Sequence, residues 1–224
     1  MKNKFVLLLL LAAAAGFNSC SKEDRREVKQ TIDSASTTLG RDVDTLINST
    51  LSKDSVFDKT AFEPLDPSNL KVKEFRTVLN DIFDNYTDIK DELEDDDTGD
   101  VVKQAEEMRK ILMSAGTSVA RYEKSIEWKN WLTTFEKINA DLAGAKDLMT
   151  QRKFFSEMSV SLENMITKFG VKGKDVYKLT CSTLKVKNFW FTDSKELDNP
   201  YYGKDTNNEK NEKCIQVVKA WRFE

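Results

Sequence analysis

Histidine is absent from all 224 residues of this chain. Its absence removes the most common general base of enzymes, most catalytic zinc sites, and the triads of serine and cysteine proteases. Helix-breaking residues are also scarce, with three prolines and eight glycines. A chain of this length with so few of them favours extended helices over a loop-rich β fold.

An excess of charge of one sign is also missing. The chain has 35 basic and 38 acidic residues, a formal net charge of -3, and its basic residues are scattered. Such a chain has no strong field to attract nucleic acid, and we expect no nucleic-acid partner. Where the sequence predicts amphipathic helices, their apolar stripes contain almost no polar residues. No pair of catalytic carboxylates is therefore expected between packed helices. We therefore predict a protein without enzymatic activity and without a cofactor.

The N-terminus carries a targeting pattern. Lys2 and Lys4 precede an unbroken apolar run from Phe5 to Ala15. A short basic region followed by a short apolar core is typical of a secretory signal, and it is too short for a stable membrane span.

The residues that follow resemble the cleavage box of bacterial lipoproteins. Ser19 directly precedes Cys20, the residue that would carry the lipid, although Asn18 stands where a small or aliphatic residue is usual. The alternative is an ordinary secretory signal cut near Ala15. With lipid on Cys20, the acyl chains exceed the two signals that stable anchoring requires. We predict a signal peptide at residues 1–19 and an outer-membrane lipoprotein of the cell envelope, facing the periplasm or the surface.

Two long helices that pack on each other are predicted between Trp128 and Phe169. Apolar residues recur at steps of three and four, which places them on one face of each helix. The first stripe comprises Trp128, Trp131, Phe135, Ile138, Leu142 and Ala145, and the second Leu148, Phe155, Met158, Leu162, Met165, Ile166 and Phe169. Because only a short break at Lys146 and Asp147 separates them, the helices should fold back on each other.

Similar spacing predicts three earlier helices, from Val28 to Leu46, from Leu70 to Leu93 and from Val101 to Ala115. The acidic stretch from Asp91 to Asp97 lacks the closing glutamate of a calcium loop, so we interpret it as a turn between two helices. Residues 20–66 are assigned to a lipid-anchored helix and linker, in which Phe57 and Phe62 hold a loop against the bundle. Residues 67–224 form the bundle and its β cap.

After Gly173 the apolar period changes to two, which is typical of strands. Short strands are predicted around Tyr177 to Cys181, Phe189 to Phe191 and Cys214 to Phe223. The predicted fold class is therefore mainly α, an up-and-down helical bundle with a small C-terminal antiparallel β element that caps one end or side.

An ordered set of short motifs extends from about Leu70 to Val218. The set is Ile82-Phe83, Tyr86, Lys90-Asp91, Asp95-Asp96, Trp131, Gln151-Arg152, Phe155, Met158-Ser159, Phe169-Gly170, Tyr177, Cys181, Trp190, Ser194-Lys195-Glu196, Asn199-Pro200-Tyr201-Tyr202-Gly203 and Cys214. With these residues the region resembles a bacterial family of unknown function. Members of that family occur as stand-alone exported proteins and as C-terminal domains of heavy-metal efflux membrane-fusion proteins, which implies a role near export or efflux machinery.

In that family the first cysteine is commonly followed by proline and methionine, a soft-ligand pair that implies copper. Here Ser182 and Thr183 follow Cys181. Two interpretations of Cys181 and Cys214 remain open. In an exported chain they form a disulfide, which closes about 34 residues and stabilises the fold by roughly 3 to 4 kcal/mol. As thiolates they would instead hold Cu(I) in a metal-handling protein of the periplasm.

A second set of residues has both a binding and a packing interpretation. Arg152, beside Phe155, either recognises a ligand or forms an ion pair that holds the bundle. A set of four aromatic residues either stacks on a sugar or peptide or packs the sheet on the helices. The set is Trp190, Tyr201, Tyr202 and Trp221. The candidates for binding are Arg152, Trp190, Asn199, Tyr201 and Tyr202.

Three functions are compatible with these features. The first is a non-enzymatic, lipid-anchored envelope protein whose helical domain binds a protein partner or assists export or efflux. The second is the copper-type periplasmic protein that uses Cys181 and Cys214. The third is a carbohydrate-binding or hydrolytic protein, which would need facing carboxylates across a cleft.

Overall fold

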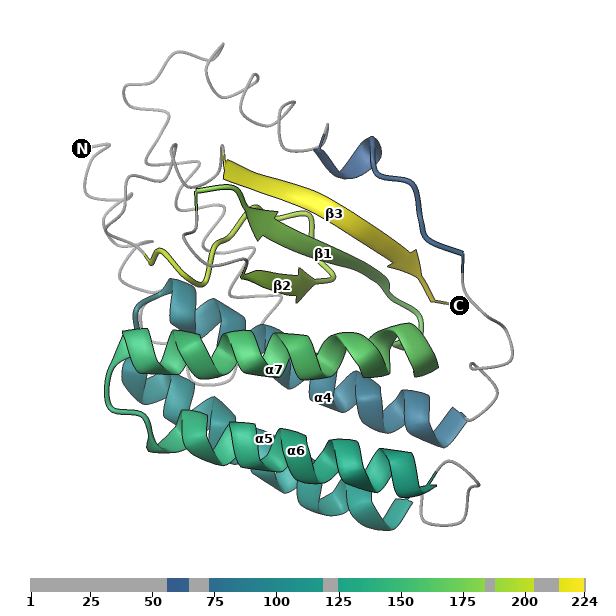
Figure 1. Cartoon of the computed structure of the whole chain (residues 1–224), viewed down its shortest axis with the longest axis vertical. Helices are drawn as coiled ribbons and strands as arrows, with labels where there is room; N and C mark the ends of the chain where they lie inside the picture. Colours follow the sequence, from purple (N-terminus) through teal and green to yellow (C-terminus); the bar gives the residue numbers. More distant parts are fainter. Residues whose placement is uncertain (1–55, 65–72, 119–124, 184–187, 204–213, 224) are drawn as a thin grey trace, which may run out of the picture. The chain divides into compact units, whose positions relative to one another are not determined.

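The computed structural model describes residues 56–64, 73–118, 125–183, 188–203 and 214–223 (Figure 1). The chain divides into two compact units, Met1–Leu51 and Ser52–Glu224, and the described residues belong to the second. The predicted signal peptide, Cys20 and the helix predicted from Val28 to Leu46 lie outside the described residues.

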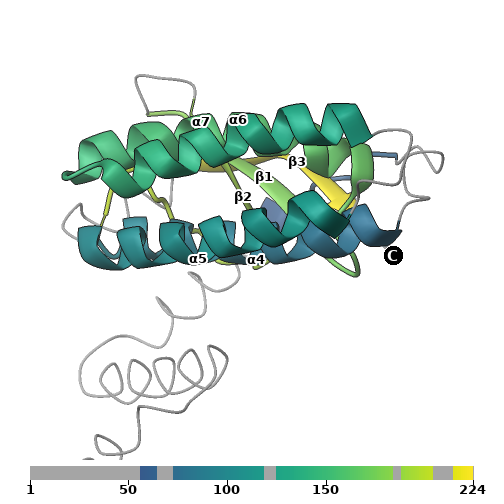
Figure 2. The same ribbon diagram turned by 90° about the horizontal axis from the view of Figure 1, so that it is seen from below.

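Four long helices form a bundle in the described part of the chain. They are α4 (Lys73–Glu94), α5 (Thr98–Ser118), α6 (Ser125–Gly144) and α7 (Leu148–Phe169). Each helix packs on the next, and α7 also packs on α4, which closes the bundle. Figure 2 shows α6 and α7 side by side in one layer and α4 and α5 in the other. The prediction of a mainly α, up-and-down bundle is confirmed.

A three-stranded antiparallel sheet covers the side of the bundle formed by α4 and α7 (Figure 1). Its strands are β1 (Asp175–Cys181), β2 (Phe189–Thr192) and β3 (Ile215–Arg222), in the order β2-β1-β3. In the central strand, Leu179 pairs with Trp190 on one side and Val217 on the other. The predicted C-terminal β element is therefore confirmed.

Polar caps mark where the helices begin. The Asp97 carboxylate accepts from the N–H of Asp100 at 2.9 Å at the start of α5. Asp147 accepts from the N–H of Thr150 at 2.9 Å at the start of α7. These carboxylates satisfy N–H groups that have no partner within the helix. At the other end of α7, Gly170 adopts a positive φ of 72° and its N–H donates to the carbonyl of Ile166, as expected for a glycine that ends a helix.

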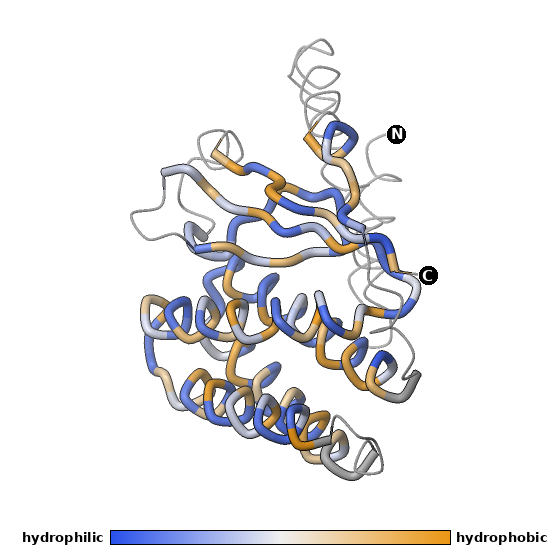
Figure 3. Tube along the Cα trace, turned by 45° about the vertical axis from the view of Figure 1, so that its right-hand side comes forward, coloured by the Kyte–Doolittle hydropathy of each residue, from blue (hydrophilic) through white to orange (hydrophobic). Residues whose placement is uncertain are grey.

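The apolar stripes meet in one continuous core. Figure 3 shows apolar and polar positions alternating along each helix. The ring of Phe75 on α4 lies 4.9 Å from that of Trp128 on α6 and 4.8 Å from that of Phe169 on α7. These aromatic contacts join three of the four helices, and they use the residues that the helical spacing selects.

The expectation that the helix faces contain almost no polar residues is wrong. The buried polar residues on the helices are Asn85, Thr87, Lys90, Asn139, Gln151 and Ser159. Asn85, Asn139, Gln151 and Ser159 bond to groups on a neighbouring helix. Thr87 bonds within α4, and Lys90 pairs with carboxylates. The Asn139 amide donates to the carbonyl of Ala105 at 2.8 Å, and the Gln151 amide donates to that of Thr98 at 3.1 Å. These bonds between helices act as cross-links, since a buried polar group requires a partner.

Residues 56–63, which the sequence assigns to the linker, pack on the sheet. The rings of Phe57 and Tyr177 lie 4.9 Å apart, edge to face. Phe62 forms a parallel bridge with Ala220, and the N–H of Glu63 donates to the Ala220 carbonyl at 2.7 Å. Phe57 and Phe62 hold the loop as expected, but against β1 and β3 of the sheet instead of the helical bundle.

A buried hydroxyl joins the sheet to the bundle. The Tyr86 hydroxyl lies 2.6 Å from Ser159 Oγ and accepts from the N–H of Phe191 at 3.2 Å. Since Ser159 Oγ donates to the carbonyl of Phe155, Tyr86 is the donor in its bond with Ser159. Burial raises the pKa of Tyr86 well above its usual range, so this hydroxyl stays neutral. One side chain thus links α4, α7 and β2.

Replacing Tyr86 with phenylalanine should lower the free energy of unfolding by about 1 to 3 kcal/mol, because the buried N–H of Phe191 loses its acceptor. Urea denaturation at constant pH measures this change. Tyr202→Phe is the matched control, since that hydroxyl bonds to Thr183 at an exposed site, and we expect less than about 0.5 kcal/mol. Equal losses in the two variants would contradict the assigned role of Tyr86.

Candidate functional site

Arg152, at the start of α7, joins three separate parts of the chain. Its Nε donates to the Pro200 carbonyl at 2.7 Å. One terminal nitrogen donates to the Leu93 carbonyl at 2.8 Å and to Asp96 Oδ1 at 2.6 Å. The guanidinium is therefore directed at protein groups, which agrees with the ion-pair interpretation of this residue.

The turn that receives Arg152 has an unusual backbone. Asp96 has a φ of 59°, a left-handed conformation that aspartate tolerates better than most residues. Gly203 has a φ of 69°, and a Cβ atom at this position would collide with the Asp96 carboxylate. Only glycine lets the segment from Asn199 to Gly203 approach Asp96 this closely.

The same segment contacts the two cysteines. Cys181 and Cys214 form a disulfide with an S–S distance of 2.02 Å, which confirms the first of the two interpretations. The Asn199 amide approaches Cys214 Sγ at 4.0 Å, and its oxygen accepts from the N–H of Tyr201 at 3.0 Å. With the sulfurs bonded to each other, the copper alternative has no thiolate ligands in this state.

The aromatic candidates lie in the packing between sheet and helices. Trp190 is fully buried, and the ring of Tyr201 lies 6.0 Å from those of both Trp190 and Phe155. The Tyr201 hydroxyl donates to the Phe189 carbonyl at 3.2 Å, and burial raises its pKa. The face of Trp190 is thus covered. Arg152 bonds to the segment that contains Asn199 and Tyr201, so these three candidates come together in a packed region.

A buried charge cluster was not foreseen from the sequence. Lys90 is only 3% exposed, and its ammonium lies 2.8 Å from Asp91, 3.7 Å from Glu94 and 3.9 Å from Asp198. Burial opposes the charged form of Lys90, but the three carboxylates outweigh it and raise its pKa. Burial, followed by repulsion from Asp198, raises the pKa of Glu94 to about 8. Helical spacing gives no signal for this cluster, because Asp198 comes from the distant C-terminal loop.

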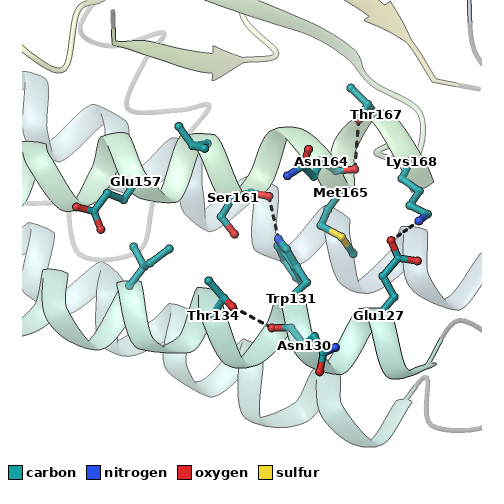
Figure 4. A pocket seen from close by; sticks show the side chains of 12 residues that line it. Glu127, Asn130, Trp131, Thr134, Glu157, Ser161, Asn164, Met165, Thr167 and Lys168 are labelled. Atoms are coloured by element: carbon teal, nitrogen blue, oxygen red, sulfur yellow. Dashed lines mark hydrogen bonds and ion pairs between the residues drawn. The ribbon is translucent and has the colours of Figure 1, made fainter. Parts of the chain in front are cut away.

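The outer face between α6 and α7 carries an open groove of about 860 Å³ (Figure 4), here called the α6–α7 groove. Its walls carry neutral amides and hydroxyls, and its floor is apolar. The wall residues are Asn130 and Thr134 on α6 and Ser161 and Asn164 on α7, and the floor contains Trp131 and Met165. Apart from Trp131 and Met165, which belong to the apolar stripes, these residues gave no signal in the sequence.

The floor of the groove is rigidly held. Trp131 is 9% exposed, and its indole N–H donates to the Ser161 carbonyl at 2.9 Å. The ring centroids of Trp128 and Phe135 lie 5.2 Å and 4.9 Å from the ring centroid of Trp131. An ion pair between Lys168 and Glu127 closes one end of the groove (Figure 4).

Two further properties concern the described residues only. No group of three or more cysteines, aspartates or glutamates among them is arranged to hold a metal ion. None of the helices in the described ranges combines the length and the apolar character needed to cross a membrane.

The charge cluster predicts an unusual dependence of stability on pH. The pKa of Glu94 is about 8 in the folded protein against an ordinary 4.5, so the folded state binds more protons between these values. Its contribution to stability therefore falls as the pH rises through this window. Glu94→Gln should gain stability relative to the parent between about pH 5 and pH 9, as measured by urea denaturation.

Glu106→Gln is the control for this prediction, because Glu106 is exposed on α5. Its stability should follow the parent across the pH range. The raised pKa of Glu94 is contradicted if the free energies of unfolding of the parent and Glu94→Gln differ by a constant amount from about pH 5 to pH 9.

Comparison with known proteins identifies one domain. Residues 82–174 match the model of a family described as "Protein of unknown function (DUF3347)". The match includes Lys90, Arg152 and the α6–α7 groove, and it ends before β1. No curated protein and no solved structure matches the chain. The central part of this protein is therefore similar to a domain of unknown function.

Proposed function

We propose that this chain is an exported, lipid-anchored envelope protein without catalytic activity, whose helical domain binds a partner polypeptide. The observation that carries the proposal is the disulfide between Cys181 and Cys214. Such bonds persist in oxidising compartments outside the cytoplasm and are rare inside it. The basic and apolar N-terminal pattern that ends at Cys20 supports the same location.

The distribution of polar chemistry supports binding rather than catalysis. The groups with strongly raised pKa values are engaged with other protein groups, Tyr86 in the core and the half-buried Glu94 beside Lys90 and Asp198. The guanidinium of Arg152 is likewise occupied by carbonyls and a carboxylate. By contrast, the α6–α7 groove is open to solvent and combines an apolar floor with walls of neutral amides and hydroxyls. Its two carboxylates, Glu127 and Glu157, lie at opposite ends, and Glu127 is paired with Lys168, so the lining supports recognition rather than paired acid–base chemistry.

An accessory role beside export or heavy-metal efflux machinery is the finer form of this proposal. It rests on the resemblance to proteins of that setting, carried by motifs such as the segment from Asn199 to Gly203. An outer-membrane location, facing the periplasm or the surface, follows from the lipoprotein pattern at Cys20.

The anchor is tested by the mass of the mature protein. We expect the chain purified from membranes to begin at Cys20 and to carry a diacylglyceryl group and an N-acyl chain. Cys20→Ala should lack this mass and leave the membrane fraction, whereas the double variant Cys181→Ala/Cys214→Ala should keep it. An unmodified N-terminus near Ala15 in a soluble protein would contradict the proposal.

The oxidised state is tested by thiol labelling. The denatured mature protein should react with no maleimide before reduction and with two maleimides after it, because the thiol of Cys20 is blocked by lipid. Two labels before reduction would show that Cys181 and Cys214 are free after export, and would restore the copper alternative.

A further inference from the structure

We propose that the α6–α7 groove binds a short peptide segment in extended conformation, with an uncharged centre and a basic side chain directed towards Glu157. This inference rests on the proposed binding role and names the chemistry of the partner. It follows from four properties of the groove, namely its walls, its floor, its length and its charges.

The walls match the hydrogen-bonding groups of an extended main chain. The side-chain amides of Asn130 and Asn164 make no hydrogen bond to the described residues, and they lie on opposite walls beside Trp131 (Figure 4). Thr134 and Ser161 lie on opposite walls on the other side of that ring. An amide offers both donors and acceptors, as does each peptide group of an extended segment. The groove therefore presents complementary groups on both sides of a bound strand.

The floor argues against a carbohydrate ligand. Sugar recognition commonly uses an open aromatic face, but the ring of Trp131 is enclosed by Trp128 and Phe135 and is 9% exposed. Val160, 54% exposed, lies at the rim and offers an apolar contact to one side chain of the peptide. Alternate side chains of a strand point in opposite directions, so some face this apolar surface while the others face solvent.

The length of the groove and the polarity of its walls favour an extended segment over a helix. The lining of α6 runs from Glu127 to Ile138, about 16 Å along the helix axis. This distance accommodates about five extended residues. A bound helix satisfies its own main-chain groups and requires an apolar groove. Such a ligand would make no use of the exposed amides of Asn130 and Asn164.

The charged residues of the groove set the orientation of the bound peptide. Two carboxylates and one ammonium line the groove, and the ammonium of Lys168 is paired with Glu127 at one end. At the other end Glu157 lies 4.0 Å from Lys153 on the same helix, and it also interacts with Lys137 on α6, whose ammonium is bonded to Asp141. A lysine or arginine of the ligand would therefore find its carboxylate at the Glu157 end.

The test uses the mature full-length protein and a phage library of random 12-residue peptides, followed by fluorescence anisotropy with synthetic copies of the enriched sequences. We expect enriched peptides that alternate apolar and uncharged polar residues and share one lysine or arginine. Asn130→Ala/Asn164→Ala should weaken binding about tenfold or more. Thr134→Trp, which fills the groove, should abolish it.

The charge at Glu157 is tested by a double-mutant cycle. Glu157→Gln should weaken the parent peptide severalfold, and replacing the basic residue of the peptide by glutamine should then cause no further loss. Thr133→Ala and Glu136→Gln are the matched controls, since both residues are exposed on α6 and do not line the groove. They should leave affinity unchanged, and urea denaturation confirms that each variant is folded.

Several outcomes would overturn the inference. The inference is wrong if the library enriches no peptide, or if the enriched peptides become helical when bound. It is also wrong if the substitutions at Asn130, Asn164 and Thr134 leave the affinity unchanged. Self-association that Thr134→Trp removes in the ultracentrifuge would assign the groove to a second copy of the chain and would also overturn it. The mass of Cys20 is measured on the same preparation. A lipidated protein that binds no peptide disproves only this inference, and an unlipidated one that binds peptide disproves only the anchor.

Discussion

The burial of the helices' apolar faces against one another is the constraint on which the rest of this structure depends. Phe75 illustrates it, since one ring on α4 contacts Trp128 on α6 and Phe169 on α7. Burial of this kind contributes about 25 cal/mol for each Å² of apolar surface, but it has no direction. It brings the four helices together without deciding which polar groups meet or where the sheet lies.

Polar bridges supply that direction. The Tyr86 hydroxyl holds β2 against α4 and α7, and Arg152 holds the loop at Pro200 against the turn at Asp96. Displacing either element by one position would leave buried groups without partners, which costs more than a hydrogen bond contributes when formed. The residues that look most reactive in the sequence are thus occupied in maintaining the fold. The α6–α7 groove, on the opposite side of α7 from this network, carries amides without such a task.

The proposed function rests on two features. One is the contrast between a polar network that holds the fold and a groove that is open to solvent, and the other is the chemistry of the cysteines. Cys181 and Cys214 stabilise the sheet as a disulfide, and Cys20 is left as the candidate for lipid attachment. With the proposed lipid anchor, a stable bundle with an open groove would suit a protein that holds a partner near the membrane. Its similarity to a domain of unknown function extends over the helices that build the groove.

The sequence by itself determined the helices and strands, because the period of apolar residues is a local property that sets which face each side chain occupies. Trp128, Phe135 and Phe155 are buried as their spacing predicts. Only the tertiary structure decided the partners of Lys90 and Arg152, and whether the two sulfurs bond or stay apart. Asp198 reaches Lys90 only after the C-terminal loop has packed on the bundle. The groove likewise exists because α6 and α7 meet in one particular register, and no local pattern specifies which polar residues of two packed helices will face each other across it.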